Sequence, residues 1–142
     1  MCIEKHKELM KKFETMINTA DEKLAEELIA PDAVFYTPAA SEPLAGPKGY
    51  LSVVYWMRKG FSDVQWKLEE MAVEGSVAAV RWTCSGTHDG NFLGLEATGK
   101  KFSACVMNFY YFNEDDKIYK DIAAEGMLAI LRPLGLCQFF LA

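Results

Sequence analysis

Histidine is scarce in this sequence, and its cysteines are not paired. The 142 residues include two histidines, His6 and His88, and four cysteines, none of them in a C-x-x-C pair. Zinc sites in proteins use Cys, His or carboxylate ligands at short, recurring spacings. We therefore expect no metal site and no cofactor, and we expect the thiols to be reduced and mostly buried.

The sequence also has no basic stripe and no long apolar run. Its formal net charge is −5, so a polyanion would be repelled and a nucleic-acid partner is not expected. The N-terminal segment MCIEKHKELMKKF lacks the apolar stretch of a signal peptide. No run approaches the roughly 20 apolar residues that span a bilayer. We expect a cytoplasmic protein with no membrane partner.

Large rings, by contrast, are plentiful. Hydrophobic residues make up 51% of the chain and aromatic residues 13%, which suits one domain over residues 1–142 with a substantial core. The rings exceed what a small core needs, so some are available to line a cavity, although core packing is the default role of any single ring.

The hydrophobic pattern predicts helices first and hairpins afterwards, which is typical of an α+β domain. The expected elements are helices over 3–18, 22–29 and 47–59, a strand over 33–37, strand-like runs over 63–75, 76–88, 100–113 and 117–126, and a final short helix over 127–136. Pro31 is expected to stop the second helix. A curved sheet with helices on its concave side leaves a pocket between the two layers.

One glycine-rich segment carries a family pattern. Residues 81–102, RWTCSGTHDGNFLGLEATGKKF, contain G-T-H-x-G-x-F-x-G followed by T-G-K. This segment resembles the SnoaL-like polyketide cyclases of the NTF2-like superfamily. The resemblance implies a cone-shaped, curved antiparallel or mixed sheet with N-terminal helices packed over its concave face. It also implies a homodimer formed through sheet faces.

The resemblance implies a histidine–aspartate site in which this chain departs from the family. The histidine corresponds to His88, but the position of the acid on the last strand falls on Gly126. Glu125 stands next to it and is the tentative substitute, which would require a bulge or a register shift because neighbouring strand residues face opposite sides. Val106 occupies a position where the family has a small residue, so it would shrink the cavity.

The predicted function is the binding of a small, mostly apolar, carbonyl-bearing molecule, with cyclase- or isomerase-type chemistry at an altered site. His88 and Glu125 are the catalytic candidates, because a base near neutral pKa can remove a proton next to a carbonyl group. The predicted cavity-lining residues are Tyr36, Trp56, Phe92, Met107 and Asn108. Both faces of the strand over 102–112 are apolar, so the sequence does not assign the inward one.

Two alternatives stay open. A non-catalytic ligand-binding or dimerisation module is favoured by the missing acid at Gly126, and His88 would then be a hydrogen-bonded structural residue at the end of a strand. A transport adaptor on the same fold has no surface feature in its favour. Ketosteroid-isomerase-like and epoxide-hydrolase-like sites need sets of acids that the pattern does not supply, with Asp63 and Asp121 as weak candidates.

Overall fold

The computed structural model describes residues 3–124 and 126–136, and this part of the chain forms four helices and one six-stranded sheet. The elements are α1 (Ile3–Thr19), α2 (Glu22–Leu28), β1 (Ile29–Tyr36), β2 (Leu44–Ala45), α3 (Gly46–Gly60), β3 (Gln65–Glu74), β4 (Val77–Thr87), β5 (Lys101–Phe112), β6 (Ile118–Ala124) and α4 (Met127–Leu131). None of the described helices is long and apolar enough to cross a membrane.

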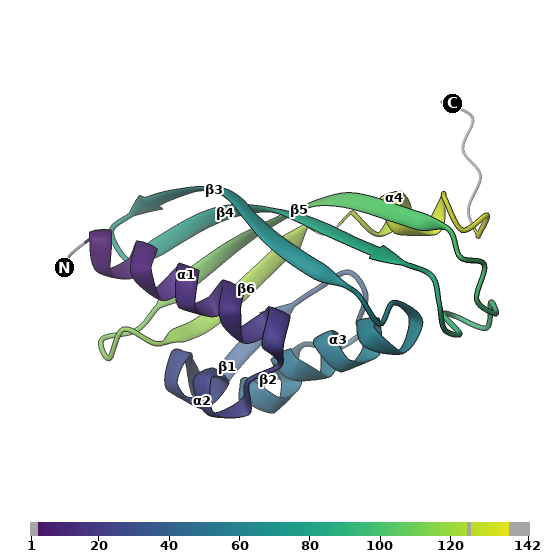
Figure 1. The fold of residues 1–142 in the computed structure, drawn as a ribbon. Helices are drawn as coiled ribbons and strands as arrows, with labels where there is room; N and C mark the ends of the chain where they lie inside the picture. The colour runs from purple at the N-terminus through teal and green to yellow at the C-terminus, as the bar shows by residue number, and fades with distance from the viewer. Residues whose placement is uncertain (1–2, 125, 137–142) are drawn as a thin grey trace.

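The sheet is mixed and curved, and it does not close on itself (Figure 1). Its strand order is β2-β1-β6-β5-β4-β3. β1 and β6 run parallel, and the other neighbouring pairs are antiparallel. The predicted α+β fold with a curved mixed sheet is therefore confirmed, while β2 and β3 remain as two unpaired edges.

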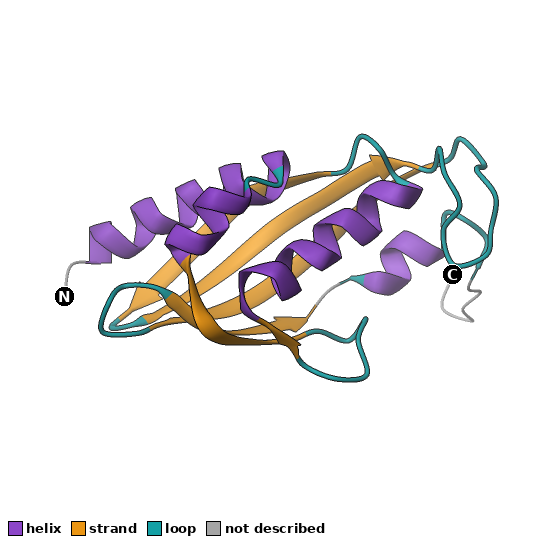
Figure 2. Ribbon diagram, turned by 90° about the horizontal axis from the view of Figure 1, so that it is seen from below, coloured by secondary structure: helices purple, strands orange, loops and turns teal. Residues whose placement is uncertain are grey.

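The helices lie across one face of this sheet. Seen from the helix side, α1 and α3 run over the strands, with α2 beside α1 (Figure 2). Met10, Phe13 and Ile17 form an apolar stripe on α1 that packs inward, because all three are buried. Burying this stripe against the sheet is what stabilises an amphipathic helix in a globular domain.

The short strand β2 is not among the predicted elements. The boundaries of the predicted elements agree with the structure to within one or two residues, with two exceptions. The strand predicted to start at Ala33 begins at Ile29, so Pro31 lies inside β1 and the helix before it ends at Leu28. Proline is tolerated in a strand at an irregular position, and the pairing of β1 with β6 shifts register between Ile29 and Val34. The last helix, α4, ends at Leu131 rather than extending to residue 136.

The two faces of β4 and β5 are clearly different. Along β4, buried and half-buried residues alternate, and along β5 the even-numbered residues are the better buried ones. Phe102, Asn108 and Tyr110 therefore face the helices, whereas Met107 and Phe109 face outward with exposed fractions of 55% and 52%. The inward face that the sequence left open is the even-numbered one.

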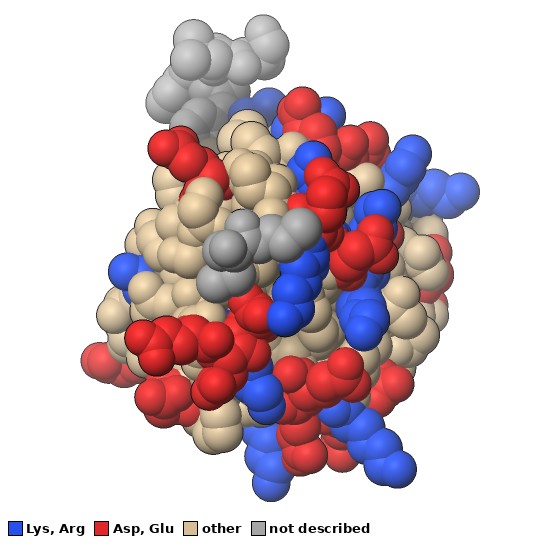
Figure 3. Space-filling view, turned by 90° about the vertical axis from the view of Figure 1, so that its left-hand side faces the viewer, with Lys and Arg blue, Asp and Glu red and all other residues tan. Residues whose placement is uncertain are grey.

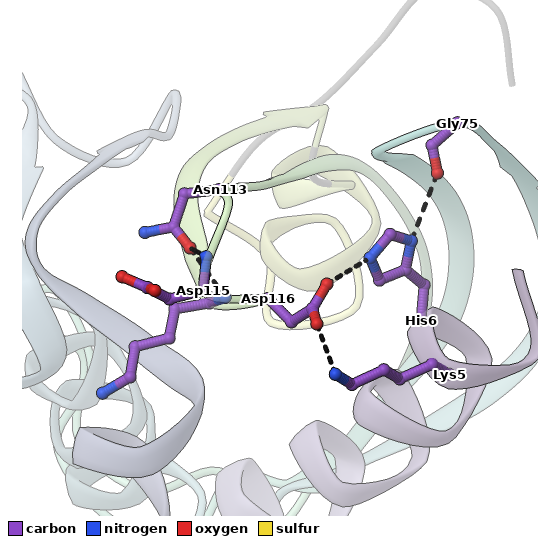
Figure 4. Close-up of polar contacts among 7 residues, drawn as sticks. Lys5, His6, Gly75, Asn113, Asp115 and Asp116 are labelled. Atoms are coloured by element: carbon purple, nitrogen blue, oxygen red, sulfur yellow. Dashed lines mark hydrogen bonds and ion pairs between the residues drawn. The ribbon is translucent and has the colours of Figure 1, made fainter. Parts of the chain in front are cut away.

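A buried histidine joins α1 to two hairpin turns of the sheet (Figure 4). His6 is fully buried and stacks on the ring of Phe112, with a centroid separation of 4.2 Å. Its Nδ1 lies 3.2 Å from the Gly75 carbonyl oxygen, and its Nε2 lies 3.1 Å from Oδ1 of Asp116. Lys5 forms an ion pair with the same carboxylate. The contacts hold the end of the domain that Figure 3 faces, where acidic and basic side chains are interspersed.

We predict that the Asp116 contacts stabilise the fold above pH 4 and weaken below it. Hydrogen bonds from Lys5 and then His6 hold the pKa of this carboxyl below its usual value of 3.8. A lowered folded-state pKa adds stability at pH values above the usual pKa, and that stability is lost as the pH falls through the folded-state pKa. The melting temperature of Asp116→Asn should thus fall below that of the wild type at pH 7, with the gap narrowing at pH 3.

Asp115→Asn is the matched control, because Asp115 is exposed in the same turn. Asparagine tolerates the positive φ of 56° at position 116, so the variant keeps the turn itself. A gap between wild type and Asp116→Asn that is equal at pH 7 and pH 3 would contradict the prediction.

Candidate functional site

A small cavity lies between the helices and the sheet. Its free volume is about 70 Å³, and it opens beside Tyr36, which is 46% exposed. Most of its wall is apolar or aromatic. The lining residues are Ile17, Phe35, Tyr36, Thr37, Leu44, Tyr50, Val53, Val54, Trp66, Trp82, Val106, Asn108, Tyr110, Asp121 and Ala123. Apolar walls with a few convergent polar groups are the usual composition of a small-molecule site.

A bulge in β6 turns a carboxylate into this cavity. The pairing of β5 with β6 shifts between Tyr111 and Phe112, because Tyr111 pairs with Lys120 while Phe112 pairs with Ile118. Tyr119 is therefore an extra residue on β6, and it reverses the facing of the residues that follow it. As a result Asp121 is only 3% exposed and lines the cavity, whereas Ile122 is 42% exposed.

Asn108 is the hydrogen-bonding partner of this carboxylate. Its Nδ2 donates to Oδ1 of Asp121 over 2.8 Å, and Asn108 itself is 7% exposed. A buried carboxylate is costly unless it accepts such hydrogen bonds. The amide oxygen, Oδ1 of Asn108, is also buried, but it has no hydrogen-bond partner among the residues that the structure describes.

A tyrosine next to this pair supplies a proton donor. Tyr110 is opposite Asp121 in the sheet, and its hydroxyl oxygen accepts a hydrogen bond from Nε1 of Trp82 over 3.1 Å. Burial raises the pKa of the Tyr110 phenol well above 10.0, with further contributions from Tyr50 and Asp121. The phenol thus keeps its proton at neutral pH and acts as a donor inside the cavity.

The structure divides the five predicted lining residues between three places. Tyr36 and Asn108 line the cavity. Trp56 and Phe92 pack on each other at 4.9 Å between ring centroids, in a second apolar cluster near the end of α3. Met107 lies on the outer face of the sheet, where it lines a broad surface groove.

His88 lies in the second cluster and is not among the residues that line the cavity. Its ring is fully buried, 5.6 Å from that of Phe61. Nδ1 accepts a hydrogen bond from the Thr98 backbone N–H over 3.2 Å and lies 2.9 Å from Oγ1 of Thr98. Its backbone pairs with Lys100 and Gly99, which closes the base of the loop. A catalytic role for His88 stays a prediction, and its observed contacts join the two ends of the loop.

The glycine-rich segment that carries the family pattern packs against the end of α3. The backbone N–H groups of Asp89 and Gly90 both donate to the Gly60 carbonyl oxygen, each over 3.1 Å. A side chain at position 90 would begin 2.0 Å from the Lys59 carbonyl oxygen, so only glycine permits this approach. Phe92 then inserts beside Phe61 at 4.8 Å. The motif anchors a loop to a helix.

The predicted acid positions have different outcomes. Glu125 lies outside the described residues, and its role stays a prediction. Gly126 precedes α4, and a Cβ atom built there would lie 2.7 Å from the backbone carbonyl oxygen of Cys105. The position where the resemblance expects an aspartate is therefore too close to the neighbouring strand for any side chain.

From the sequence, Asp121 was only a weak candidate, and neither it nor Tyr110 or Tyr50 was predicted to line the cavity. Alternation counted from Ile118 places Asp121 on the outer face, so only the bulge brings it inside. A signal was present, because an isolated acid within the apolar run of a last strand is unusual. Without the bulge, however, that acid would have been taken as solvent-exposed.

Restoring the family acid should damage this protein rather than repair it. We predict that Gly126→Asp lowers the free energy of unfolding by about 1–3 kcal/mol, the usual cost of forcing atoms into a packed position. The measurement is urea unfolding followed by tryptophan fluorescence. Ala97→Asp is the control, since Ala97 is exposed in the loop before β5. Equal stabilities for the two variants would show that position 126 accommodates a side chain.

A curved mixed sheet whose helix-covered face encloses a small cavity defines a known kind of α+β domain. The model of the SnoaL-like polyketide cyclases matches residues 7–134, so the chain belongs to this family. The resemblance carried by residues 81–102 is thereby confirmed.

Two curated relatives are cyclases. The chain is 32% identical over 84 residues to the aklanonic acid methyl ester cyclase DauD of Streptomyces sp. (strain C5), which covers 58% of this chain and 49% of DauD. It is 33% identical over 79 residues to the aklanonic acid methyl ester cyclase DnrD of Streptomyces peucetius, covering 54% of this chain and 51% of DnrD. The matched part of the chain spans about half the length of these relatives.

Solved structures share the fold over most of the chain. IdmH from Streptomyces antibioticus superposes with a TM-score of 0.81 at 25% identity, covering 92% of this chain and 98% of IdmH. AclR from Streptomyces galilaeus superposes with a TM-score of 0.84 at 22% identity, covering 97% and 89% of the two chains. The second likeness shows the fold alone.

Proposed function

We propose that this protein binds a small, mostly apolar, carbonyl-bearing molecule in the cavity and moves a proton on the carbon next to the carbonyl group. The observation that carries the proposal is the Asp121 carboxylate, buried in an apolar cavity and hydrogen-bonded by Asn108 at 2.8 Å. A positioned base of this kind accelerates proton transfer by about 10²–10⁴. Membership of a cyclase family supports chemistry next to a carbonyl group.

The proposed reaction uses Asp121 as base and then as acid. The carboxylate takes the proton from the carbon next to the carbonyl, and the electron pair of the C–H bond moves onto the carbonyl oxygen to form an enolate. Tyr110, which is protonated and hydrogen-bonded to Tyr50, lies on the same wall and would turn its O–H toward the developing negative charge. In an isomerisation Asp121 returns the proton to carbon. In a cyclisation the enolate attacks a second carbonyl of the ligand, and Asp121 protonates the resulting alkoxide.

The cavity limits the size of the reacting group. Its 70 Å³ is about half of the roughly 150 Å³ engineered protein cavity that binds benzene. A fused-ring polyketide would not be enclosed, so a few heavy atoms enter while the remainder of a larger ligand passes the mouth at Tyr36. Val106 lines the wall, in keeping with the expectation that it reduces the space.

The test of this function is hydrogen–deuterium exchange of 2-butanone in D₂O, followed by NMR. Wild-type protein should accelerate exchange at the carbons next to the carbonyl, and Asp121→Asn should reduce the rate by about 10²-fold or more, because the amide is not a base. Asp32→Asn is the matched control, since Asp32 is an exposed aspartate on the neighbouring strand β1. Exchange that Asp121→Asn leaves unchanged would remove Asp121 as the base.

A non-catalytic binding module is the alternative, favoured by the absence of an acid at position 126. It predicts that 2-butanone shifts the NMR signals of cavity residues while no variant changes the exchange rate. The same experiment therefore separates the two functions.

We further propose that the protein is a homodimer through the outer face of the sheet. Met107, Phe109 and Ile122 are exposed on neighbouring strands there, around a groove of about 590 Å³. Arg81 and Glu70 form an ion pair at the edge of this groove. In a dimer with a twofold axis, the apolar residues of one copy would pack against the same residues of the other. Arg81 of each copy would lie near Glu70 of its partner.

Phe109→Lys should convert this dimer into a monomer, because two lysines would be buried near the twofold axis. Sedimentation velocity measures the mass, and Ile3→Lys is the control, since Ile3 is 44% exposed on α1, away from the sheet's outer face. A wild-type protein that sediments as a monomer at 100 μM, roughly a hundred times a micromolar Kd, would overturn the proposal.

A further inference from the structure

The amide nitrogen of Asn108 has a hydrogen-bond partner in the described part of the chain, and the amide oxygen does not. Nδ2 donates to Asp121, which settles the orientation of the amide because a carboxylate can only accept. Asn108 is one of the residues that line the cavity, and 93% of its surface is buried, since 7% is exposed. This oxygen has no hydrogen-bond partner among the residues that the structure describes.

An unpaired buried acceptor costs about 1–3 kcal/mol unless a donor fills it. An amide oxygen can accept hydrogen bonds only, so neither a carbonyl group nor a carboxylate can satisfy it. Two neighbouring donors have other partners, since Nε1 of Trp82 donates to the hydroxyl of Tyr110, and the hydroxyl of Tyr110 is hydrogen-bonded with Tyr50. The missing donor must come from whatever occupies the cavity.

We infer that Asn108 is a specificity-determining residue that accepts a hydrogen bond from a hydroxyl group of the ligand, and that the substrates are hydroxy-carbonyl compounds. The inference rests on the proposed function, which places the carbon next to the ligand's carbonyl group at Asp121. The donor and the acceptor of Asn108 are two ends of one planar amide, so the ligand hydroxyl lies close to the carbon that faces Asp121. An α-hydroxy ketone satisfies both contacts within a few heavy atoms, as a 70 Å³ cavity requires.

The test compares 3-hydroxy-2-butanone with 3-methyl-2-butanone, in which a methyl group replaces the hydroxyl. Binding of each to the full-length protein is titrated by NMR chemical-shift changes. The hydroxy ketone should bind about 10-fold more tightly, the ratio that corresponds to 1.4 kcal/mol. Burial of apolar surface alone predicts the opposite order, because the methyl ketone is the more apolar of the two.

Asn108→Leu should remove the preference, with the affinity ratio falling to about one or reversing. Asn91→Leu is the matched control, since Asn91 is an exposed asparagine of the loop after β4, and it should keep the 10-fold ratio. If Asn108→Leu fails to fold, the comparison of the two ketones on the wild-type protein still decides.

Three results are informative about the two proposals separately. Equal affinities of the wild type for both ketones would overturn the inference, since a resident water would then satisfy Asn108, while Asp121-dependent exchange would still support the proposed function. A 10-fold preference without catalysed exchange would support Asn108 as a binding determinant and refute the base. Binding of neither ketone would overturn the inference.

Discussion

The candidate site depends on one extra residue in β6. With strict alternation from Ile118, the strand would present Ile122 to the cavity and Asp121 to solvent. The bulge at Tyr119 exchanges the two. Burying the carboxylate is unfavourable by itself, and the hydrogen bond from Asn108 compensates part of that cost. A single local irregularity of the backbone thus creates the polar end of an otherwise apolar cavity, as bulges commonly do beside functional sites.

The same bulge shapes the outer face. Ile122 joins Met107 and Phe109 there, so one backbone feature supplies a carboxylate to the inside of the sheet and a large apolar side chain to the outside. If the protein dimerises through this face, residues that line the proposed site and residues that form the dimer interface alternate along β5 and β6. A change in the register of either strand would disturb both at once.

The proposed base does not occupy the position that the family resemblance indicates. That position, Gly126, lies at the end of the sheet against the Cys105 carbonyl oxygen and has no room for a side chain. Asp121 lies deeper, opposite Tyr110 and beside Phe35 in the sheet. A narrow, apolar interior strengthens the interactions of a charge with nearby donors, because little water is present to screen them. The combination suits a small reacting group rather than a large fused ring.

The family motif and the proposed site lie in different clusters. His88 and Phe92 pack with Phe61 at the end of α3, where Gly90 lets two backbone segments meet. A motif of this kind identifies a fold reliably because close backbone contacts tolerate few substitutions. It says less about reactivity, since the side chains around the cavity come from other strands and from the helices.

The sequence by itself determined the fold class, the order of the elements and the family, because these follow from apolar periodicity and from a motif that is contiguous in the chain. The tertiary structure alone decided which residues meet in the cavity. Both faces of β5 are apolar, so alternation could not choose between Met107 and Asn108, and curvature with helix packing made the choice. The register shift in β6 depends on pairing with β5, and no local pattern around Asp121 encodes that pairing.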